Sequence, residues 1–216
     1  MENKWGRFYF SRTGLGKNRT VPIYFQIMKV VFLDRDGVIN KYPGDKLYVT
    51  SLKKFRFLPG VKKAIALLNR AGFKIFVVSN QAGVGKGTYS QKTLNAITAK
   101  MLGDIEQAGG RITKVYYCGH RKGAGCNCRK PKPGMLKKAA KEFQFNLKNA
   151  YFIGDTIRDV FTAKNAGCKP ILVLSGKEKK GDGSIFLFSR SRNKNRTVPF
   201  FKGLREAARF IIRKSQ

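Results

Sequence analysis

The sequence KVVFLDRDGV, residues 29–38, decides the fold class. Its first half, residues 29–33, is a short apolar and β-branched run, which is typical of a strand buried on both faces. Two acids, Asp34 and Asp36, follow directly on the turn that leaves this run. Such a pair can aim at one substrate atom, one acid as nucleophile and the other as proton donor. The same residues are also common in ordinary turns, so the pair alone leaves both interpretations open.

Four more runs of this kind follow, at residues 73–78, 112–117, 150–153 and 170–174. Between them, apolar residues recur at helical spacing in residues 61–71, 94–105, 135–143 and 159–166, with Ser90 as the expected cap of the second helix. This alternation predicts a three-layer α/β domain with a central parallel sheet and right-handed crossovers. Ligands bind such sheets at the carboxyl ends of the strands. We therefore expect Asp34, Ser79 and Asp155 to meet at one edge.

The composition is that of an ordinary globular chain. It has 216 residues, of which 42% are hydrophobic and 26% are charged. No stretch approaches the roughly 18 to 20 uninterrupted apolar residues of a membrane span, and the N-terminus lacks the apolar core of a signal peptide. We therefore expect a cytoplasmic protein with no membrane partner.

The net charge is unusual: 45 Lys and Arg stand against 12 Asp and Glu, a formal charge of +33. Such an excess predicts attraction to polyanions, including nucleic acid and phosphorylated small molecules. The basic residues are spread along the whole chain rather than concentrated in one block. A compositional bias explains this pattern better than a dedicated nucleic-acid stripe does, although a nucleic-acid partner stays open.

The chain ends differ from the middle. We expect residues 1–27 to be a basic extension that is either disordered or paired at a sheet edge, and residues 28–216 to be the folded domain. Within that domain, residues 177–199 form a divergent segment and residues 200–214 a C-terminal amphipathic helix. The sequence KNRTVP occurs at both 17–22 and 194–199, a repeat for which the residues suggest no physical cause.

Three further segments carry side chains suited to chemistry. GDTIRD, residues 154–159, places Asp155 and Asp159 four residues apart, a spacing that can share one face of a helical turn but is also ordinary at a helix N-terminus. SNQ, residues 79–81, ends a strand with a hydroxyl that can hold a phosphoryl oxygen. KPKPG, residues 130–134, presents Lys130 beside prolines, where it can counter anionic charge.

These motifs resemble those of the haloacid dehalogenase (HAD) superfamily of phosphatases. Within it, DRDGVIN (34–40), SNQAGVGKG (79–87) and CRKPKPGM (128–135) resemble the D-glycero-D-manno-heptose-1,7-bisphosphate 7-phosphatases and the related histidinol phosphatases. The match runs from about residue 28 to residue 175. It implies a Rossmann-like HAD fold, and the lack of a long insertion between Asp36 and Ser79 predicts a minimal cap.

The resemblance also implies a mechanism. Asp34 attacks phosphorus to give an aspartyl-phosphate, and Asp36 protonates the leaving oxygen and then deprotonates water. Ser79 and Lys130 bind the transferring phosphoryl group. The implied Mg²⁺ ligands are Asp34, Asp155 and the Asp36 carbonyl, with Asp159 in support. The implied substrate contacts are Asn80, Gln81, Lys86 and Arg129.

The cysteines give a separate signal. Cys118, Cys126 and Cys128 lie within eleven residues of the chain's single histidine, His120. Four such ligands at short spacing predict a closed tetrahedral Zn²⁺ site, and the resemblance implies the same loop. Because no position stays open for catalysis, this zinc is expected to be structural and to hold the loop that carries Arg129.

These features predict a Mg²⁺-dependent phosphoric monoester hydrolase that acts as a monomer. The resemblance implies that the first expected substrate is the 7-phosphate of a heptose bisphosphate, feeding the synthesis of envelope lipopolysaccharide. Histidinol phosphate is the nearest alternative. A nucleic-acid 3′-phosphatase would use the same four motifs together with the +33 charge, and a non-catalytic nucleic-acid-binding protein would use the charge alone.

Overall fold

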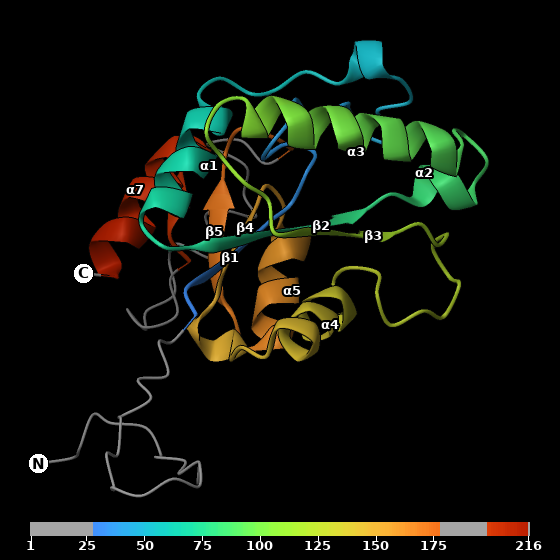
Figure 1. The fold of residues 1–216 in the computed structure, drawn as a ribbon. Coiled ribbons are helices and arrows are strands. Elements are labelled where there is room, and N and C mark those ends of the chain that lie inside the picture. Colours follow the sequence, from blue (N-terminus) through green and yellow to red (C-terminus); the bar gives the residue numbers. More distant parts are fainter. Residues whose placement is uncertain (1–27, 178–197, 216) are drawn as a thin grey trace, which may run out of the picture.

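The computed structural model describes residues 28–177 and 198–215 (Figure 1). The predicted basic extension and most of the divergent segment lie outside the described residues. So does the first copy of the KNRTVP repeat and most of the second, and the predicted pairing at a sheet edge is therefore untested.

The core is a six-stranded parallel sheet with the strand order β3-β2-β1-β4-β5-β6. The strands are β1 (Val30–Leu33), β2 (Lys74–Asn80), β3 (Lys114–Cys118), β4 (Tyr151–Gly154), β5 (Lys169–Val173) and β6 (Phe200–Phe201). The five predicted runs are β1 to β5, which confirms the parallel α/β sheet. All four residues of β1 are buried, as the position of this strand between β2 and β4 requires.

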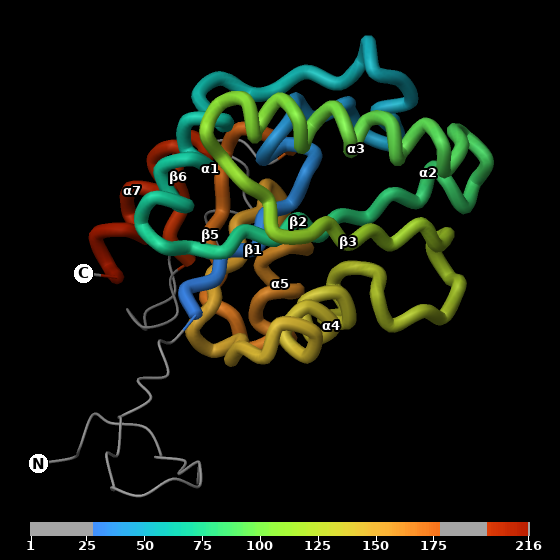
Figure 2. Tube along the Cα trace, in the orientation of Figure 1, coloured from blue at the N-terminus to red at the C-terminus, as the bar shows by residue number. Residues whose placement is uncertain are grey.

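Helices cover both faces of this sheet (Figures 1 and 2). They are α1 (Val61–Arg70), α2 (Ala82–Gly85), α3 (Gln91–Glu106), α4 (Gly134–Phe143), α5 (Ile157–Ala166) and α7 (Leu204–Lys214), with short 3₁₀ turns η1 (Leu52–Lys54) and η2 (Leu147–Asn149). Residues of α1, α3 and α7 pack with Val31 and Leu33 on one face. Residues of α4 and α5 pack with Val30 and Phe32 on the other. The side chains of β1 thus alternate between two cores, which makes the three layers.

The C-terminal segment departs from the prediction of one helix over residues 200–214. Phe200 and Phe201 pair with Leu172 and Val173 as the edge strand β6, and the helix begins only at Leu204. Phe201 then packs on Phe210 of α7, with ring centroids 5.1 Å apart. The amphipathic pattern identified the helix correctly, but a two-residue strand is too short to show a periodicity of its own.

The segment between β1 and β2 contains only the short turn η1 before α1. No additional domain is inserted there, in agreement with the predicted minimal cap. Across the described ranges, no helix combines the length and apolar character that crossing a bilayer requires.

The predicted cap of α3 is present. Ser90 has extended backbone geometry, and its hydroxyl oxygen accepts a hydrogen bond from the Thr93 amide at 3.0 Å. Ser90→Ala leaves that amide without this partner, and we expect the free energy of unfolding to fall by about 1 kcal/mol. Urea denaturation measures the change. Ser90→Asp keeps the acceptor and is expected to stay close to wild type; an equal loss in both variants would show that the cap contributes nothing.

Candidate active site

Three acids converge at the carboxyl edge of the sheet. Asp34 directly follows β1, Asp155 directly follows β4, and Asp159 lies in the first turn of α5. All three are buried, and each has a carboxylate oxygen within 4.8 Å of the others. The topology explains the convergence, because neighbouring parallel strands end at the same edge. Asp155 precedes the cap Thr156 of α5, so the two acids meet across a helix start rather than on a helix face.

Lys130 supplies the cation of this cluster. Its side chain is 3% exposed, and Nζ lies 2.8 Å from Oδ2 of Asp34 and 2.7 Å from Oδ1 of Asp159. Burial acts to lower the pKa of Lys130, but attraction to the two carboxylates outweighs it and the pKa is raised. Lys130 therefore stays protonated beside the acid that is predicted to be the nucleophile.

Asn80 holds the Lys130 segment in place. Its Oδ1 accepts from the Lys130 amide at 3.0 Å, and its Nδ2 donates to the Lys130 carbonyl at 3.2 Å. The side chain predicted to touch substrate therefore has both polar ends bonded to the main chain of another residue. Because Asn80 ends β2, it ties the lysine loop to the sheet edge.

The cluster carries more negative than positive charge. Burial, followed by repulsion from Asp159 and Asp36, raises the pKa of Asp34 to about 6, although Lys130 opposes the shift. Burial and the charges of Asp159 and Asp34 raise the pKa of Asp155 well above its usual value. A divalent cation would offset this surplus, and carboxylate oxygens are the ligands that Mg²⁺ prefers.

The remaining contacts of Asp155 and Asp159 fix their orientation. Asp159 Oδ2 accepts from the amide and hydroxyl of Thr156, at 3.1 and 2.6 Å, as part of a capping box. The Lys177 amide donates to Asp155 Oδ2 at 2.8 Å. A Cβ at Gly37 or Gly176 would lie 2.1 or 2.0 Å from the same oxygen, so the backbone can approach Asp155 only because both residues are glycine.

Asp36 is held separately from these acids. Arg35 Nε and Nη2 donate to its two oxygens, both at 3.1 Å. Asn40 Nδ2 donates to Oδ1 at 2.9 Å, and Gln81 Nε2 donates to Oδ2 at 3.0 Å. Sequence reasoning identified Asp36 but missed Arg35 and Asn40, although both lie inside the DRDGVIN motif. Their places in this motif, directly before and four residues after Asp36, were the signal that could have identified them.

The side chain of Gln81, which is predicted to contact substrate, makes its hydrogen bonds within the protein. Its side chain is fully buried, and Oε1 accepts from Arg35 Nη2 at 2.9 Å and from the Tyr89 hydroxyl at 2.6 Å. Its Nε2 also donates to Ser79 Oγ at 3.1 Å. Gln81 therefore connects the predicted phosphate-binding hydroxyl of Ser79 with Asp36, and it leaves no polar atom for a ligand.

A cavity of about 420 Å³ adjoins Lys130. It lies between two parts of the loop that joins β3 to α4, residues 119–133, and the start of α5. Figure 2 shows this loop running from β3 to α4. Its lining includes no acid among the described residues and five cations besides Lys130, namely Arg121, Lys122, Arg129, Lys132 and Arg158. Arg129, a predicted substrate contact, lines this cavity. Lys86 does not line this cavity: it is exposed after α2, with Nζ 5.8 Å from the ring centroid of Tyr48.

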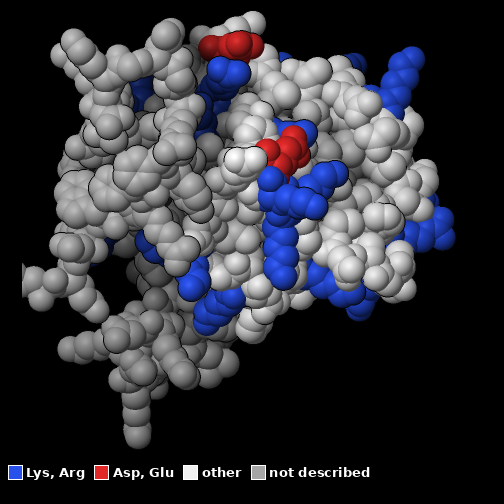
Figure 3. All heavy atoms as spheres, turned by 60° about the horizontal axis from the view of Figure 1, so that its bottom comes forward, with Lys and Arg blue, Asp and Glu red and all other residues white. Residues whose placement is uncertain are grey.

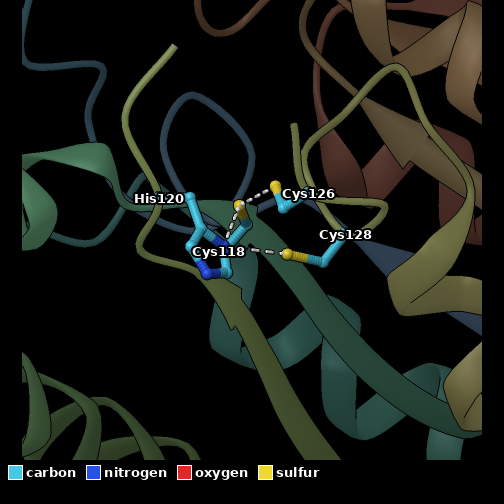
Figure 4. Close-up of side chains that lie close together, drawn as sticks. All are labelled: Cys118, His120, Cys126 and Cys128. Carbon is cyan, nitrogen blue, oxygen red and sulfur yellow. Dashed lines mark hydrogen bonds between the residues drawn. The ribbon is translucent and has the colours of Figure 1, made fainter. Parts of the chain in front are cut away.

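The predicted metal cluster also comes together. Figure 4 shows His120 and the three cysteines around one point, and their ligand atoms lie within 4.8 Å of one another. Cys118 Sγ is 3.7 Å from Cys126 Sγ, and His120 Nδ1 is 3.2 Å from Cys128 Sγ. Zinc–sulfur bonds of about 2.3 Å in a tetrahedron separate two sulfurs by about 3.8 Å. The spacing therefore fits a closed zinc site.

Comparison with known proteins gives the family. The chain is 40% identical over 153 residues to a D-glycero-beta-D-manno-heptose-1,7-bisphosphate 7-phosphatase of Pseudomonas putida, an alignment that covers 71% of this chain and 86% of the relative. The chain belongs to the heptose-bisphosphate phosphatase family. The D-glycero-alpha-D-manno-heptose-1,7-bisphosphate 7-phosphatase of Campylobacter jejuni is 35% identical and is covered over 96% of its length, with 81% of this chain aligned.

A solved structure of the heptose-bisphosphate phosphatase family agrees. The D,D-heptose 1,7-bisphosphate phosphatase of B. bronchiseptica, complexed with magnesium and phosphate, superposes with a TM-score of 0.76 at 34% identity, covering 87% of this chain and 99% of that one. A family model described as "HAD-hyrolase-like" matches residues 127–190. The chain is thus a HAD phosphatase of this family, with the fold that its motifs predicted.

Proposed function

We propose that the chain hydrolyses the 7-phosphate of D-glycero-D-manno-heptose 1,7-bisphosphate. The observation that carries this proposal is the cluster of Asp34, Asp155, Asp159 and Lys130 beside a cavity lined by cations. The cluster suits phosphoryl transfer, and the cavity suits a leaving group that carries a second phosphate. The relatives from Pseudomonas putida and Campylobacter jejuni are named for this reaction.

In the proposed reaction, Asp34 attacks phosphorus, so that an oxygen–phosphorus bond forms to the enzyme as the bond to the sugar oxygen breaks. Asp36 gives its proton to that oxygen. Water then attacks the aspartyl-phosphate, Asp36 takes the proton from this water, and phosphate leaves. Ser79 and Lys130 bind the phosphoryl oxygens, and positioning with charge neutralisation supplies most of the rate.

We infer that Mg²⁺ is held by Asp34 and Asp155 with the carbonyl of Asp36, and that Asp159 supports it. The surplus of buried negative charge at these residues fits a divalent ion, and the B. bronchiseptica relative was crystallised with magnesium. When bound, the ion supplies positive charge for the transferring phosphoryl group.

We also propose that Cys118, His120, Cys126 and Cys128 hold a structural Zn²⁺ ion. Cys128 directly precedes Arg129 and Lys130, so the metal would fix the loop that presents both cations. Arg129 Nη1 already donates to the His120 carbonyl at 3.2 Å, which links the two parts of the loop. Three thiols kept as metal ligands fit a reducing compartment, and we therefore place the protein in the cytoplasm.

The cations that line the cavity would distinguish heptose 1,7-bisphosphate from histidinol phosphate, the nearest alternative substrate. The leaving group of heptose 1,7-bisphosphate retains a phosphate at carbon 1, which Arg129 and its basic neighbours would attract. The leaving group of histidinol phosphate carries an ammonium ion, which the same residues would repel. The electrostatics of the cavity therefore favour the bisphosphate.

We expect phosphate release to be fastest from heptose 1,7-bisphosphate in a panel with heptose 7-phosphate, histidinol phosphate and a 3′-phosphorylated oligonucleotide. A charged contact to the second phosphate that is worth about 1.5 to 3 kcal/mol predicts roughly a 10- to 150-fold advantage in kcat/KM over heptose 7-phosphate. Malachite-green detection with Mg²⁺, at low and physiological salt, measures the series. Equal rates for the two heptose phosphates would contradict a role for the cavity.

The oligonucleotide tests whether the net charge is itself functional. A nucleic-acid phosphatase predicts a preference for this substrate and a steep loss of activity with salt, because each phosphate contact releases counterions. Figure 3 shows Lys and Arg of the described residues at several separate places on one face. We expect the oligonucleotide to be the poorer substrate.

A further inference from the structure

Arg35 is the largest fully buried side chain in the described part of the chain. It lies between the proposed nucleophile Asp34 and the proposed acid Asp36, yet its guanidinium makes no ion pair with Asp34. Its donors reach Asp36 and Gln81, and its Cζ lies 5.7 Å from the ring centroid of Tyr117. Nη1 is also buried and has no hydrogen-bond partner among the described residues.

Burying this charge lowers the free energy of unfolding unless its partners compensate for the lost hydration. An unsatisfied buried donor costs about 1 to 3 kcal/mol, and an ion pair that is removed from water contributes little net stability. An apolar side chain of similar volume would fill the same space without these penalties. The arrangement around Arg35 therefore points to a role in the reaction rather than in folding.

The geometry of the pair indicates what that role is. Nε of Arg35 donates to Oδ1 of Asp36 and Nη2 donates to Oδ2, while Nη2 also lies 3.0 Å from Oδ1. The rigid fork therefore holds both oxygens and fixes the plane of the carboxylate as well as its position. Gln81 accepts from the same Nη2 and donates to Asp36, which braces both partners. Neighbouring residues can pair in this way because the turn folds back: the Arg35 carbonyl accepts from the amides of Ile39 and Asn40, at 2.8 and 3.1 Å.

The four donors around Asp36 have unequal strength. Arg35 supplies two charged donors, and Asn40 and Gln81 supply one neutral donor each. Together they occupy the roughly four lone-pair sites of a carboxylate, so a proton reaches Asp36 only when one donor withdraws. The neutral donors are the weaker ones. Arg35 can thus keep the plane of the carboxylate fixed while an oxygen is released to carry the proton.

We propose that Arg35 is a positioning residue, whose buried fork orients the Asp36 carboxylate for proton transfer to the leaving oxygen. This inference rests on the proposed function, in which Asp36 acts as acid and then as base. During transfer, the proton passes from Asp36 to the ester oxygen. At the same time the bond between that oxygen and phosphorus breaks, and a bond forms between Asp34 and phosphorus. Arg35 itself neither gains nor loses a proton.

The test compares leaving groups. Phenyl phosphate and 4-nitrophenyl phosphate have nearly the same size, but phenol is the poorer leaving group and depends more on protonation. Because kcat/KM covers only the steps up to formation of the aspartyl-phosphate, it isolates the role of Asp36 as an acid. Arg35→Lys keeps the positive charge and loses the two-point hold. We expect it to lower kcat/KM by about 100-fold for phenyl phosphate and by less than about 5-fold for 4-nitrophenyl phosphate.

A double-mutant cycle shows whether Arg35 acts through Asp36. Asp36→Asn removes the acid, so adding Arg35→Lys to it is expected to change the ratio of the two kcat/KM values by less than about 2-fold. Equal slowing of both esters by Arg35→Lys would indicate a purely structural role and overturn the proposal. Additive effects of the two substitutions on the ratio would overturn it as well.

A second variant keeps the test decisive if Arg35→Lys does not fold. Gln81→Met removes the brace and leaves Arg35 in place, and it also removes the bond to Ser79 Oγ, which affects both esters alike. We therefore expect an additional loss of about 10-fold for phenyl phosphate, seen in the ratio of the two kcat/KM values. An unchanged ratio, with both esters slowed equally, contradicts the proposal. A wild-type preference for a sugar other than the heptose would refute the proposed substrate and leave this comparison valid, because both aryl esters need only the phosphatase chemistry.

Discussion

Asp34→Asn is expected to lower the rate of phosphate release by at least about 10⁴-fold, because an amide cannot form the aspartyl-phosphate. Lys130 would lose one of its two carboxylate partners, but its ion pair with Asp159 at 2.7 Å remains. The fold is therefore expected to persist, and circular dichroism would show it. Single-turnover assays with heptose 1,7-bisphosphate measure the loss.

The matched control is Asp104→Asn. Asp104 is an acid of α3 whose Oδ2 pairs with Lys100 at 2.9 Å, far along the chain from the cluster. Exposed helical pairs of this kind contribute only about 0.3 to 0.5 kcal/mol. We expect activity close to wild type. Substantial turnover by Asp34→Asn, with its control intact, would refute Asp34 as the nucleophile.

Asp34→Asn is also expected to change how the free energy of unfolding of the metal-free protein depends on pH. Burial and neighbouring acids raise the pKa of Asp34 to about 6, from an unfolded value near 3.8. As pH rises from about 4 to 6, the unfolded chain ionises this group before the folded one does, so stability falls over that window. Asp34→Asn removes this contribution, and Asp155 retains one of the same sign. Thermal denaturation in EDTA across this pH range should show a shallower decline for the variant, whereas an unchanged slope would contradict the shift.

Cys126→Ser is expected to release one equivalent of zinc and to lower kcat/KM by about 10- to 100-fold. Burial acts to raise the pKa of Cys126, but the Arg129 amide, which donates to its sulfur, and the two neighbouring thiols outweigh burial and lower the pKa to about 7. Cys126 is thus tied both to the metal cluster and to the main chain of Arg129. Loss of the metal therefore frees the loop that presents Arg129 and Lys130. We also expect Tm to fall by about 5 to 10 °C, which corresponds to a loss of 2 to 3 kcal/mol in a domain of this size.

Cys168→Ser provides the matched cysteine control. Cys168 is 6% exposed and packs in the core formed with α4 and α5, and it is not one of the four residues whose ligand atoms gather at the metal cluster. The Cys168→Ser variant is expected to retain zinc and activity, with a modest fall in its free energy of unfolding. Elemental analysis of both variants beside the wild type measures the metal. Full zinc occupancy in Cys126→Ser would contradict the four-ligand site.

The sequence by itself determined the fold class and the main cluster. Apolar runs that alternate with helical periods admit few topologies other than a parallel sheet, and residues that end parallel strands must meet at one edge. Asp34 and Asp155 could be placed for this reason. The metal cluster was equally accessible, because its four ligands lie within one short loop and their spacing is local.

Only the tertiary structure decided which polar side chains bond to the protein's own groups. Asn80 meets the main chain of Lys130 across 50 positions of the sequence, and Gln81 meets Asp36 across 45. Neither contact leaves a local pattern, so the sequence could not show that these two side chains hold the protein's own groups. Arg35 was missed for the same reason. A charged residue in a turn is ordinarily exposed. Arg35 is buried because β2 and β3, which lie far from it in the sequence, bring Gln81 and Tyr117 beside it.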